Sequence, residues 1–403
     1  MYNKLICKYL EKNDELIIND IPVSVDTEIN KIMKVYELAL GYRPTVLFKN
    51  VINYKYPILM NPYKRKAMLV NLGIKKNNWL MELYGRYYSN KHPKVIELEN
   101  EHGEVESIND LPIIKYRIND CGFYITSGIT VTKDIDTNKY NLGIYRIKVN
   151  KDGSASIFMA ENSDGYKNLL KYVKKQRKMP VVITVGAEMI YYLLAAAKIP
   201  NSVDDYKEGI KISNQDFQLV NINGILAPIG QFEISGYITG KKVKEGNFGE
   251  FKGYYVNNPF ALELIVSKIY SIENPVFIGI AAGAESGLTL SAMQGEWLLY
   301  KNLVDQNYNI KCIEYRIEEA GEFVAVIQTE EPSEQLISDA FAHDKRLKII
   351  FCGKNFNENP WKTISIFPFK TVEKNYNVSN SIESGKKIGF LMIEKKELSR
   401  VEI

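Results

Sequence analysis

Hydrophobic positions in the first hundred residues alternate between a helical spacing and short consecutive runs. Residues 5–12 have the helical spacing, and Glu15–Ile18 is a short strand-like run. Asp26 is a suitable N-cap for a helix that continues to about Leu40. Two short strands that begin with proline follow, at Pro44–Phe48 and Pro57–Met60. This alternation predicts an N-terminal α/β domain over residues 1–118.

The middle of the chain has many short alternating runs that are separated by polar turns. Strands are predicted at Phe123–Thr126, Gly128–Thr132, Tyr140–Val149, Ala155–Met159, Phe217–Ile222, Gln231–Thr239, Gly253–Val256, Ala261–Tyr270 and Val276–Ala281. An apolar strand at Val181–Val185 lies between helices expected near 164–178 and 187–198. Many short strands with polar turns are typical of a barrel or a strongly curved sheet, which we expect over residues 119–284.

The last part of the chain again mixes the two patterns. A long helical pattern covers Ser286–Asp305, and a second one lies near 333–343. Three strands are expected here, at Ile310–Ile317, Glu322–Gln328 and Leu347–Phe351. This pattern predicts a C-terminal α/β domain over residues 285–403.

Composition places the chain among ordinary globular proteins. The 403 residues are 45% apolar and 25% charged. No apolar run reaches the about 18 residues of a membrane-spanning helix, and the first residues do not read as a signal peptide. A net charge of +4 is too small to indicate nucleic-acid binding.

Cysteine and histidine counts limit the chemistry. The four cysteines are far apart and form no Cys-x-x-Cys pair: Cys7, Cys121, Cys312 and Cys352. Reduced thiols and a cytoplasmic location are therefore expected. The three histidines do not lie at the spacing of zinc ligands: His92, His102 and His343. Any metal ion should accordingly be held largely by oxygen ligands.

Two segments carry candidate chemistry. Glu245 and Glu250 lie five residues apart around two glycines, and paired carboxylates can divide into an acid and a base. A simple polar turn is the alternative interpretation. Asn141 and Arg146 lie at the two ends of a predicted strand, on opposite faces if it is continuous. The alternative here is a strand with a surface arginine.

A third segment, Gly279-x-x-x-Gly283-x-x-x-Gly287, lies between a predicted strand and a predicted helix. Glycines at such a place can cradle a phosphate. The spacing is neither that of a Rossmann fingerprint nor that of a P-loop, so a structural turn is favoured.

Taken together, several segments resemble the UbiD family of decarboxylases that depend on prenylated FMN. The similar segments occur in the family's order at Tyr124–Gly128, Lys133–Thr137, Asn141–Arg146, Pro180–Ala187, Glu233–Ile238, Glu245–Glu250 and Gly253–Tyr255. The resemblance covers nearly the whole chain and weakens after about residue 285. It implies an N-terminal α/β domain, a central split β-barrel that binds the flavin, and a C-terminal α/β domain that mediates oligomerisation.

The resemblance also implies a catalytic set. Arg146, Glu245 and Glu250 occupy the positions of the family's arginine and two acidic residues. In that pattern the arginine pairs with Glu245 and orients the substrate carboxylate, which a guanidinium can bind bidentately. Glu250 is the expected proton donor, and it must be protonated near neutral pH to act so. The same pattern places Ile144 beside the flavin.

The family's metal site is only partly preserved. There an Asn, a His and a Glu bind a divalent ion, usually manganese, that bridges to the flavin phosphate, with potassium nearby. Asn141 matches the Asn, whereas Asp164 and Asp205 fall at the other two positions. Carboxylate and amide oxygens still suit Mn²⁺ or Mg²⁺. Because an Asp in place of a neutral imidazole adds negative charge beside a phosphate, we expect Lys198 to replace part of the metal charge; a lysine that reaches solvent from a helix end is the alternative. The resemblance implies that Lys348 is the family's C-terminal lysine, which contacts the phosphate.

The sequence thus predicts a decarboxylase of an α,β-unsaturated or aromatic carboxylic acid, with reversible carboxylation as an open possibility. Its expected partners are the small-molecule acid, a flavin prenyltransferase that supplies the cofactor, and further copies of the chain in a homodimer or homohexamer. No nucleic acid and no membrane span are expected. Two alternatives stay open: a non-catalytic flavin-binding or partner subunit, and a relative with altered metal or cofactor use.

Overall fold

The computed structural model describes residues 15–74, 78–200, 202–251, 253–319, 321–354, 356, 360–361, 369–377 and 384–392. The chain divides into two compact units. The first unit comprises Met1–Asn77 and Gly85–Leu290, and the second comprises Asn78–Tyr84 and Ser291–Ile403. The three-domain division at residues 118 and 284 therefore stays a prediction.

Two properties expected from composition can be compared with the described part of the chain. No helix in it is long and apolar enough to cross a membrane. The cysteines that it includes are free thiols: Cys121, Cys312 and Cys352. Cys7 lies outside the described residues, as does the helix expected at residues 5–12.

The first unit begins with a four-stranded sheet in the order β1-β2-β3-β18. Its strands are β1 (Leu16–Asn19), β2 (Thr45–Phe48), β3 (Ile58–Met60) and β18 (Phe277–Gly279), accompanied by helices α2 (Glu28–Leu40) and α3 (Arg65–Asn71). The predicted strands and the long helix are confirmed. The N-cap of α2 is Thr27, with φ 65°, and not Asp26. The Thr27 amide donates to the carbonyl of Lys115, and this tie fixes the entry into the helix one residue later than expected.

Strand β18 has an unexpected partner. It was expected within the curved sheet of the central domain, but it pairs in parallel with β3, Phe277 opposite Ile58. Phe277 and Ile278 are fully buried. A short apolar strand can fill a buried position in either sheet, so its hydrophobic pattern did not specify which sheet it joins.

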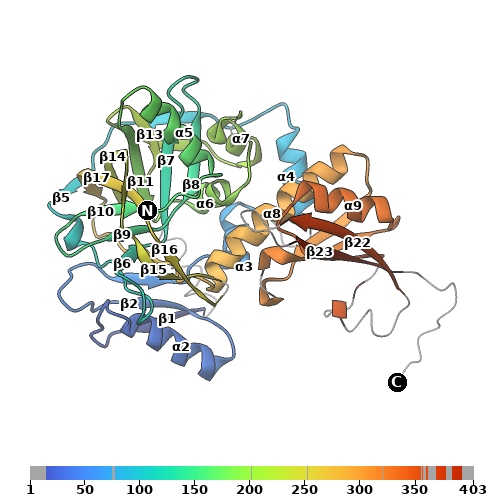
Figure 1. Cartoon of the computed structure of the whole chain (residues 1–403), viewed down its shortest axis with the longest axis horizontal. Helices are drawn as coiled ribbons and strands as arrows, with labels where there is room; N and C mark the ends of the chain where they lie inside the picture. Colours follow the sequence, from blue (N-terminus) through green and yellow to red (C-terminus); the bar gives the residue numbers. More distant parts are fainter. Residues whose placement is uncertain are drawn as a thin grey trace. The chain divides into compact units, whose positions relative to one another are not determined.

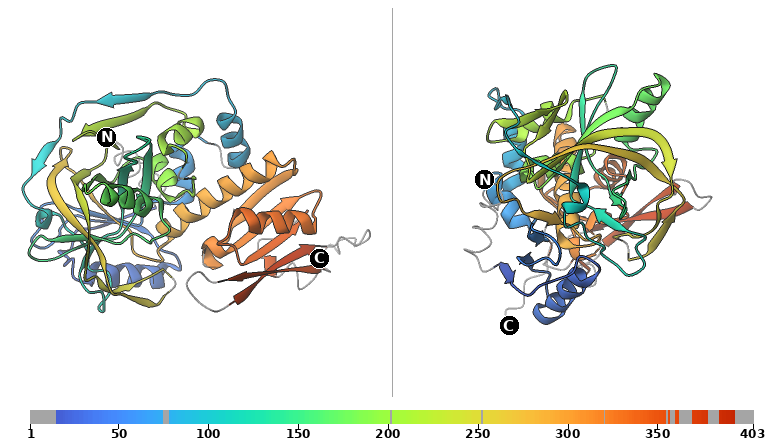
Figure 2. Two further views of the ribbon diagram at one scale, coloured as in Figure 1. Left: turned by 45° about the horizontal axis from the view of Figure 1, so that its top comes forward. Right: turned by 90° about the vertical axis from the view of Figure 1, so that its left-hand side faces the viewer.

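The centre of the first unit is a nine-stranded sheet in the order β6-β9-β10-β17-β14-β11-β7-β8, with β5 also paired to β17. Its strands are β5 (Gly103–Val105), β6 (Phe123–Ile125), β7 (Gly128–Lys133), β8 (Tyr140–Ile144), β9 (Ile147–Val149), β10 (Ala155–Ile157), β11 (Met179–Val185), β14 (Phe232–Val243) and β17 (Ala261–Ser271). The long strands β14 and β17 pair with register shifts at two places and bend strongly (Figure 2). The sheet is therefore curled into a half-barrel, as the sequence predicted.

Helices and smaller strand pairs surround this sheet (Figure 1). Helix α5 (Asp164–Lys174) packs against β7, β8, β11 and β14, while α6 (Met189–Ala196) and α7 (Asp205–Ile212) pack against β8. The remaining elements of this unit are β4 (Val95–Leu98), β12 (Phe217–Ile222), β13 (Ile225–Pro228), β15 (Gly246–Gly249), β16 (Tyr255–Asn258) and the 3₁₀ turn η2 (Ile108–Asp110). Strands β15 and β16 form a separate antiparallel hairpin.

One predicted strand is two strands in the structure. The alternating run Tyr140–Val149 divides into β8, which pairs with β7, and β9, which pairs with β6 and β10. The chain leaves the first strand at Tyr145 and Arg146 and enters a different part of the sheet. The expectation that Asn141 and Arg146 lie on opposite faces of one strand is therefore wrong, because period-two alternation holds only within a continuous strand.

The second unit contains a five-stranded sheet in the order β19-β20-β21-β23-β22. The strands are β19 (Ile310–Tyr315), β20 (Val324–Thr329), β21 (Ile349–Gly353), β22 (Phe369–Asn377) and β23 (Ser384–Met392). The other elements are α4 (Trp79–Tyr87), α8 (Glu285–Asp305), α9 (Glu334–His343), η3 (Ile317–Glu319) and η4 (Gly321–Phe323), of which α4 and α8 each include residues of both units. The predicted mixture of helices and strands is confirmed.

Candidate active site

A buried ion pair joins Arg146 to Glu245. Arg146 Nε donates to Glu245 Oε1 at 2.5 Å, and Nη2 donates to Oε2 at 2.9 Å. The side chain of Glu245 is 1% exposed and that of Arg146 is 12% exposed. The guanidinium also lies against two aromatic rings, 4.0 Å from the centroid of Phe158 and 4.8 Å from that of Phe248. Bidentate geometry and two cation–π contacts hold this arginine in one orientation.

The second glutamate faces the same guanidinium from its other side. Glu250 Oε1 lies 3.8 Å from Arg146 Nη1, and the Glu250 side chain is 29% exposed. Glu245 occupies the Nε–Nη2 edge of the fork, so Nη1 is directed at the space beside Glu250. The structure thus brings together three residues that are up to 104 positions apart in the sequence.

The segment between the two glutamates is a strand and not the polar turn considered from the sequence. Gly246–Gly249 forms β15, which pairs with β16. Gly246 has φ +96°, and a Cβ atom there would lie 2.5 Å from Cys121 Sγ, so a side chain does not fit. Glu245 and Glu250 are consequently fixed at the two ends of a short hydrogen-bonded element.

Three residues that sequence reasoning did not identify hold this strand. Lys148 Nζ donates to the carbonyl of Glu245 at 2.8 Å. Arg117 and Asp120 bond to the backbone of Gly249. Lys148 lies in β9, two residues after Arg146, but Arg117 and Asp120 lie in a turn that carries no recognisable motif. Their role depends on a contact between distant segments, which the sequence did not indicate.

The residues expected to bind a metal lie on β8 and on two helices that pack against it. Asn141 is in β8, and its Nδ2 lies 3.5 Å from Thr132 Oγ1. Asp164 and Asp205 are the first residues of α5 and α7. Asp164 Oδ1 accepts a hydrogen bond from Lys167 Nζ at 2.7 Å.

Asp205 is the most buried of these groups. It is 5% exposed, and its Oδ2 accepts from the Leu142 amide at 2.7 Å. Burial, together with repulsion from Asp204 and Asp164, raises the pKa of Asp205 to about 8. A cation beside it would relieve both effects. An amide and two carboxylates are also the hard oxygen donors that Mn²⁺ and Mg²⁺ accept, so these residues fit such an ion.

Tyr145, which directly follows β8, links this strand to the start of α5. Its hydroxyl accepts a hydrogen bond from the Gly165 amide at 3.3 Å, next to Asp164. Its ring fills space beside Gly143 and Gly165, where a Cβ would approach it to 2.6 and 2.7 Å respectively. Tyr145, which lies between Ile144 and Arg146 in the sequence, therefore reaches toward the start of α5.

Among the described residues there is no cluster of three or more His, Cys, Asp or Glu side chains suited to a metal.

The two predicted phosphate-binding lysines lie in different units. Lys198 is exposed and follows α6 in the first unit. Lys348 precedes β21 in the second unit, and its amide donates to the Phe323 carbonyl at 2.8 Å. Ile144 is half-buried at the end of β8. Roles for these three residues stay predictions.

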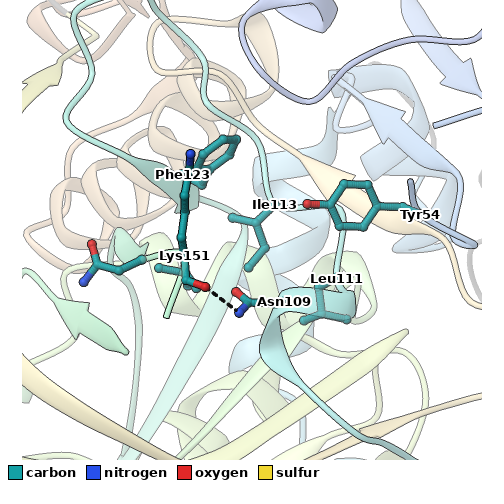
Figure 3. Close-up of a pocket in the computed structure, with 8 residues that line it drawn as sticks. Tyr54, Asn109, Leu111, Ile113, Phe123 and Lys151 are labelled. Atoms are coloured by element: carbon teal, nitrogen blue, oxygen red, sulfur yellow. Dashed lines mark hydrogen bonds between the residues drawn. The ribbon is translucent and has the colours of Figure 1, made fainter. Parts of the chain in front are cut away.

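A pocket of about 260 Å³ lies apart from these residues (Figure 3). Its lining consists of Tyr54, Asn109, Leu111, Ile113, Phe123, Val149, Asn150 and Lys151. On β6 and β9, Phe123 pairs with Val149 and Tyr124 pairs with Lys148. Because adjacent strand residues point to opposite faces, the pocket lies on the face of these strands away from Glu245, which Lys148 contacts. None of the predicted site residues lines it.

Comparison with known families agrees with this architecture. The model described as 3-octaprenyl-4-hydroxybenzoate carboxy-lyase Rift-related domain, named UbiD, matches residues 87–285. The model of the N-terminal domain of the same carboxy-lyase matches residues 7–84. Together the two models cover more than half of the chain, which belongs to the UbiD family.

Individual relatives are distant. The chain is 26% identical over 309 residues to an uncharacterised protein of Aquifex aeolicus, a match that covers 68% of this chain. That match spans 63% of the relative, so the chain covers less than two thirds of its length. Anhydromevalonate phosphate decarboxylase of Methanocaldococcus jannaschii is 25% identical over 389 residues, which is 92% of this chain and 88% of the relative.

The fold is shared with solved structures of the same class. An evolved dimeric form of the UbiD-class enzyme HmfF from Pelotomaculum thermopropionicum, in complex with prFMN, superimposes with a TM-score of 0.87. The alignment covers 99% of this chain and 96% of that one, at 19% identity. At this identity the likeness establishes the fold.

Proposed function

We propose that the chain is a non-oxidative decarboxylase of an α,β-unsaturated or aromatic carboxylic acid that uses prenylated FMN. The observation that carries this proposal is the buried Arg146–Glu245 pair with Glu250 facing the same guanidinium, on a UbiD-family scaffold. A named decarboxylase that aligns over 92% of the chain and a structural neighbour that binds prFMN support it.

Arg146 is the proposed binding group for the substrate carboxylate. Its Nε–Nη2 edge is occupied by Glu245, so the substrate is expected to contact the Nη1 side. Glu245 offsets the arginine's charge and fixes its orientation, and the rings of Phe158 and Phe248 limit its movement. A preorganised guanidinium of this kind binds a carboxylate without first reorienting.

Glu250 is the proposed proton donor. In the net reaction the bond between the carbon and its carboxylate breaks, carbon dioxide leaves, and a proton from Glu250 takes its place. The carboxyl lies 3.8 Å from Arg146, so a substrate held by the arginine lies beside it. With its side chain 29% exposed, Glu250 can take up a new proton from water after each turnover. The same steps in reverse would carboxylate.

Prenylated FMN, when bound, supplies the electron sink for this carbon chemistry. Asn141, Asp164 and Asp205 are proposed to hold Mn²⁺ or Mg²⁺ near its phosphate, with Ile144 beside the flavin. Lys198 and Lys348 are proposed as further phosphate contacts, and K⁺ as a second ion. A flavin prenyltransferase is the proposed supplier of the cofactor.

The test is co-expression with a flavin prenyltransferase, followed by absorbance spectroscopy and a decarboxylation screen over unsaturated and aromatic acids. We expect flavin absorbance in the purified protein and release of carbon dioxide from at least one acid. Glu250→Gln should lower the rate of release about 10²- to 10⁴-fold while flavin absorbance is retained. Glu263→Gln is the matched control, because Glu263 has a similar exposure of 30% but pairs with Lys241 outside the site.

Each failure has a distinct meaning. A protein that binds no flavin contradicts the proposed cofactor. A protein that binds flavin but decarboxylates none of the acids fits a non-catalytic flavin-binding subunit instead. Full activity in the Glu250→Gln variant would overturn the role given to that residue. Manganese binding by the wild type but not by Asp205→Asn, measured by calorimetry, tests the metal site separately.

A further inference from the structure

Strand β15 is hydrogen-bonded along both edges. One edge pairs with β16. On the other edge the Cys121 amide donates to the Asn247 carbonyl at 2.9 Å, and the Asn247 amide donates to Cys121 Sγ at 2.9 Å. Two residues later the Gly249 amide donates to Asp120 Oδ1 at 2.9 Å. The turn Arg117–Cys121 thus takes the place of a neighbouring strand.

Within this turn, Arg117 acts on the peptide bond that joins Gly249 to Glu250. Its Nη1 donates to the Gly249 carbonyl, and its Nη2 donates to the Ala282 carbonyl at 2.8 Å. Asp120 is 4% exposed and also accepts from the Arg117 amide at 2.9 Å. A Cβ atom at position 249 would collide with the guanidinium. Arg117 and Asp120, here called the Arg117–Asp120 clamp, therefore hold both polar groups of Gly249.

Glu250 depends on this support more than Glu245 does. The Glu245 side chain makes two short hydrogen bonds with Arg146, and Lys148 holds its carbonyl. Glu250 lies 3.8 Å from Arg146, beyond hydrogen-bond distance, and is partly exposed. The position of its carboxyl is accordingly determined by its backbone, and the residue before it is the one that the clamp holds.

We propose that Arg117 and Asp120 are positioning residues of the decarboxylation, which keep the Gly249–Glu250 peptide where the Glu250 carboxyl can reach the carbon that takes the proton. This inference rests on the proposed function. Neither residue touches the substrate; both act through Glu250. A misplacement of a reacting group by about 1 Å can slow a reaction about 100-fold, so loss of the clamp should be visible in the rate.

The kinetic test uses the protein reconstituted with cofactor. Arg117→Ala should lower kcat about 10- to 100-fold, because the proton donor is displaced. It should change KM less than about threefold, because Arg146 still binds the substrate. The kcat of Arg117→Lys, which retains one donor, should lie between the kcat of the wild type and that of Arg117→Ala. In an Arg117→Ala/Glu250→Gln double variant, the rate should equal that of Glu250→Gln alone, since there is no proton donor left to position.

Arg86 provides a matched control. It lies in the same unit, and its Nη1 and Nη2 donate to the carbonyls of Leu72 at 2.8 Å and Gly73 at 3.3 Å. Arg86→Ala removes the same kind of contact away from β15 and should leave kcat unchanged. The inference is overturned if Arg117→Ala lowers the melting temperature but not kcat. It is also overturned if the rate of the double variant is lower than that of Glu250→Gln by the same factor that Arg117→Ala causes alone.

A second measurement separates this inference from the proposed function. Amide hydrogen exchange of the cofactor-free protein reports the backbone of residues 246–250 whether or not the enzyme is active. Arg117→Ala should speed exchange in this segment at least about tenfold, and Arg86→Ala should not. Unchanged exchange in Arg117→Ala would show that there is no clamp. An inactive wild type with accelerated exchange in Arg117→Ala would refute the proposed function while leaving the clamp in place.

Discussion

The Arg146–Glu245 pair should be strongly coupled in the stability of the cofactor-free protein. The Glu245 side chain is 1% exposed and that of Arg146 is 12% exposed, so removing one partner leaves a buried charge. Arg146→Met should cost about 3–5 kcal/mol of unfolding free energy, as is typical for a broken buried pair. Glu245→Leu should cost less, because Glu250 and the rings of Phe158 and Phe248 remain beside the arginine.

The double variant, Arg146→Met with Glu245→Leu, replaces the pair by apolar groups of similar size and should cost only about 0–2 kcal/mol. Urea unfolding followed by circular dichroism measures all three free energies. Tryptophan fluorescence serves as an internal reference, because the three tryptophans lie in the second unit: Trp79, Trp297 and Trp361.

An exposed pair of the same unit gives the comparison. Lys175 and Asp136 are 48% and 47% exposed, and Lys175→Met should cost at most about 1 kcal/mol. The reasoning would be refuted if the costs of Arg146→Met and Glu245→Leu simply added in the double variant. It would equally be refuted if Arg146→Met cost no more than Lys175→Met.

Three further predictions concern stability. His102 Nδ1 donates to the buried Glu233 carboxylate, which raises the pKa of His102 above 6.5. Protonated His102 therefore stabilises the fold fully below pH 6.5, and this contribution is lost as the pH rises through the folded pKa. His102→Gln should flatten that part of the stability curve from urea titrations, and an unchanged slope would contradict the assignment. Gly246→Ala should cost about 1–3 kcal/mol because of its positive φ and the contact with Cys121 Sγ, seen as a lower thermal midpoint. Thr27→Asn should raise the midpoint by the equivalent of about 1 kcal/mol, because Asn tolerates φ 65° better than a β-branched residue; a lower midpoint would show that the threonine is needed there.

Local pattern predicted most elements of the fold. Strand β12 was expected at Phe217–Ile222 and lies there, with Gln218 and Asn221 exposed between four buried apolar residues. Helix α7 was missed, although Asp204 caps it by accepting from the Lys207 amide. A charged eight-residue helix with a central glycine has a weak apolar stripe, so the cap was the available signal.

Non-local pairing was the part that local pattern could not predict. Alternation continues through Tyr145 and Arg146, and only the different partners of β8 and β9 divide the run into two strands. The candidate site came from family motifs, which located Arg146, Glu245 and Glu250. Arg117 supports the site through backbone carbonyls, a contact that requires no particular motif around it.

The pairing of β18 with β3 has a consequence for the order in which the chain folds. Ile58 and Phe277 are opposite each other, yet Phe277 is synthesised more than two hundred residues later. Until then, one edge of β3 has no strand partner, and such an edge favours association with other chains. The small sheet is therefore completed only after the strands of the half-barrel have been synthesised, and a nascent chain must keep that edge covered until then.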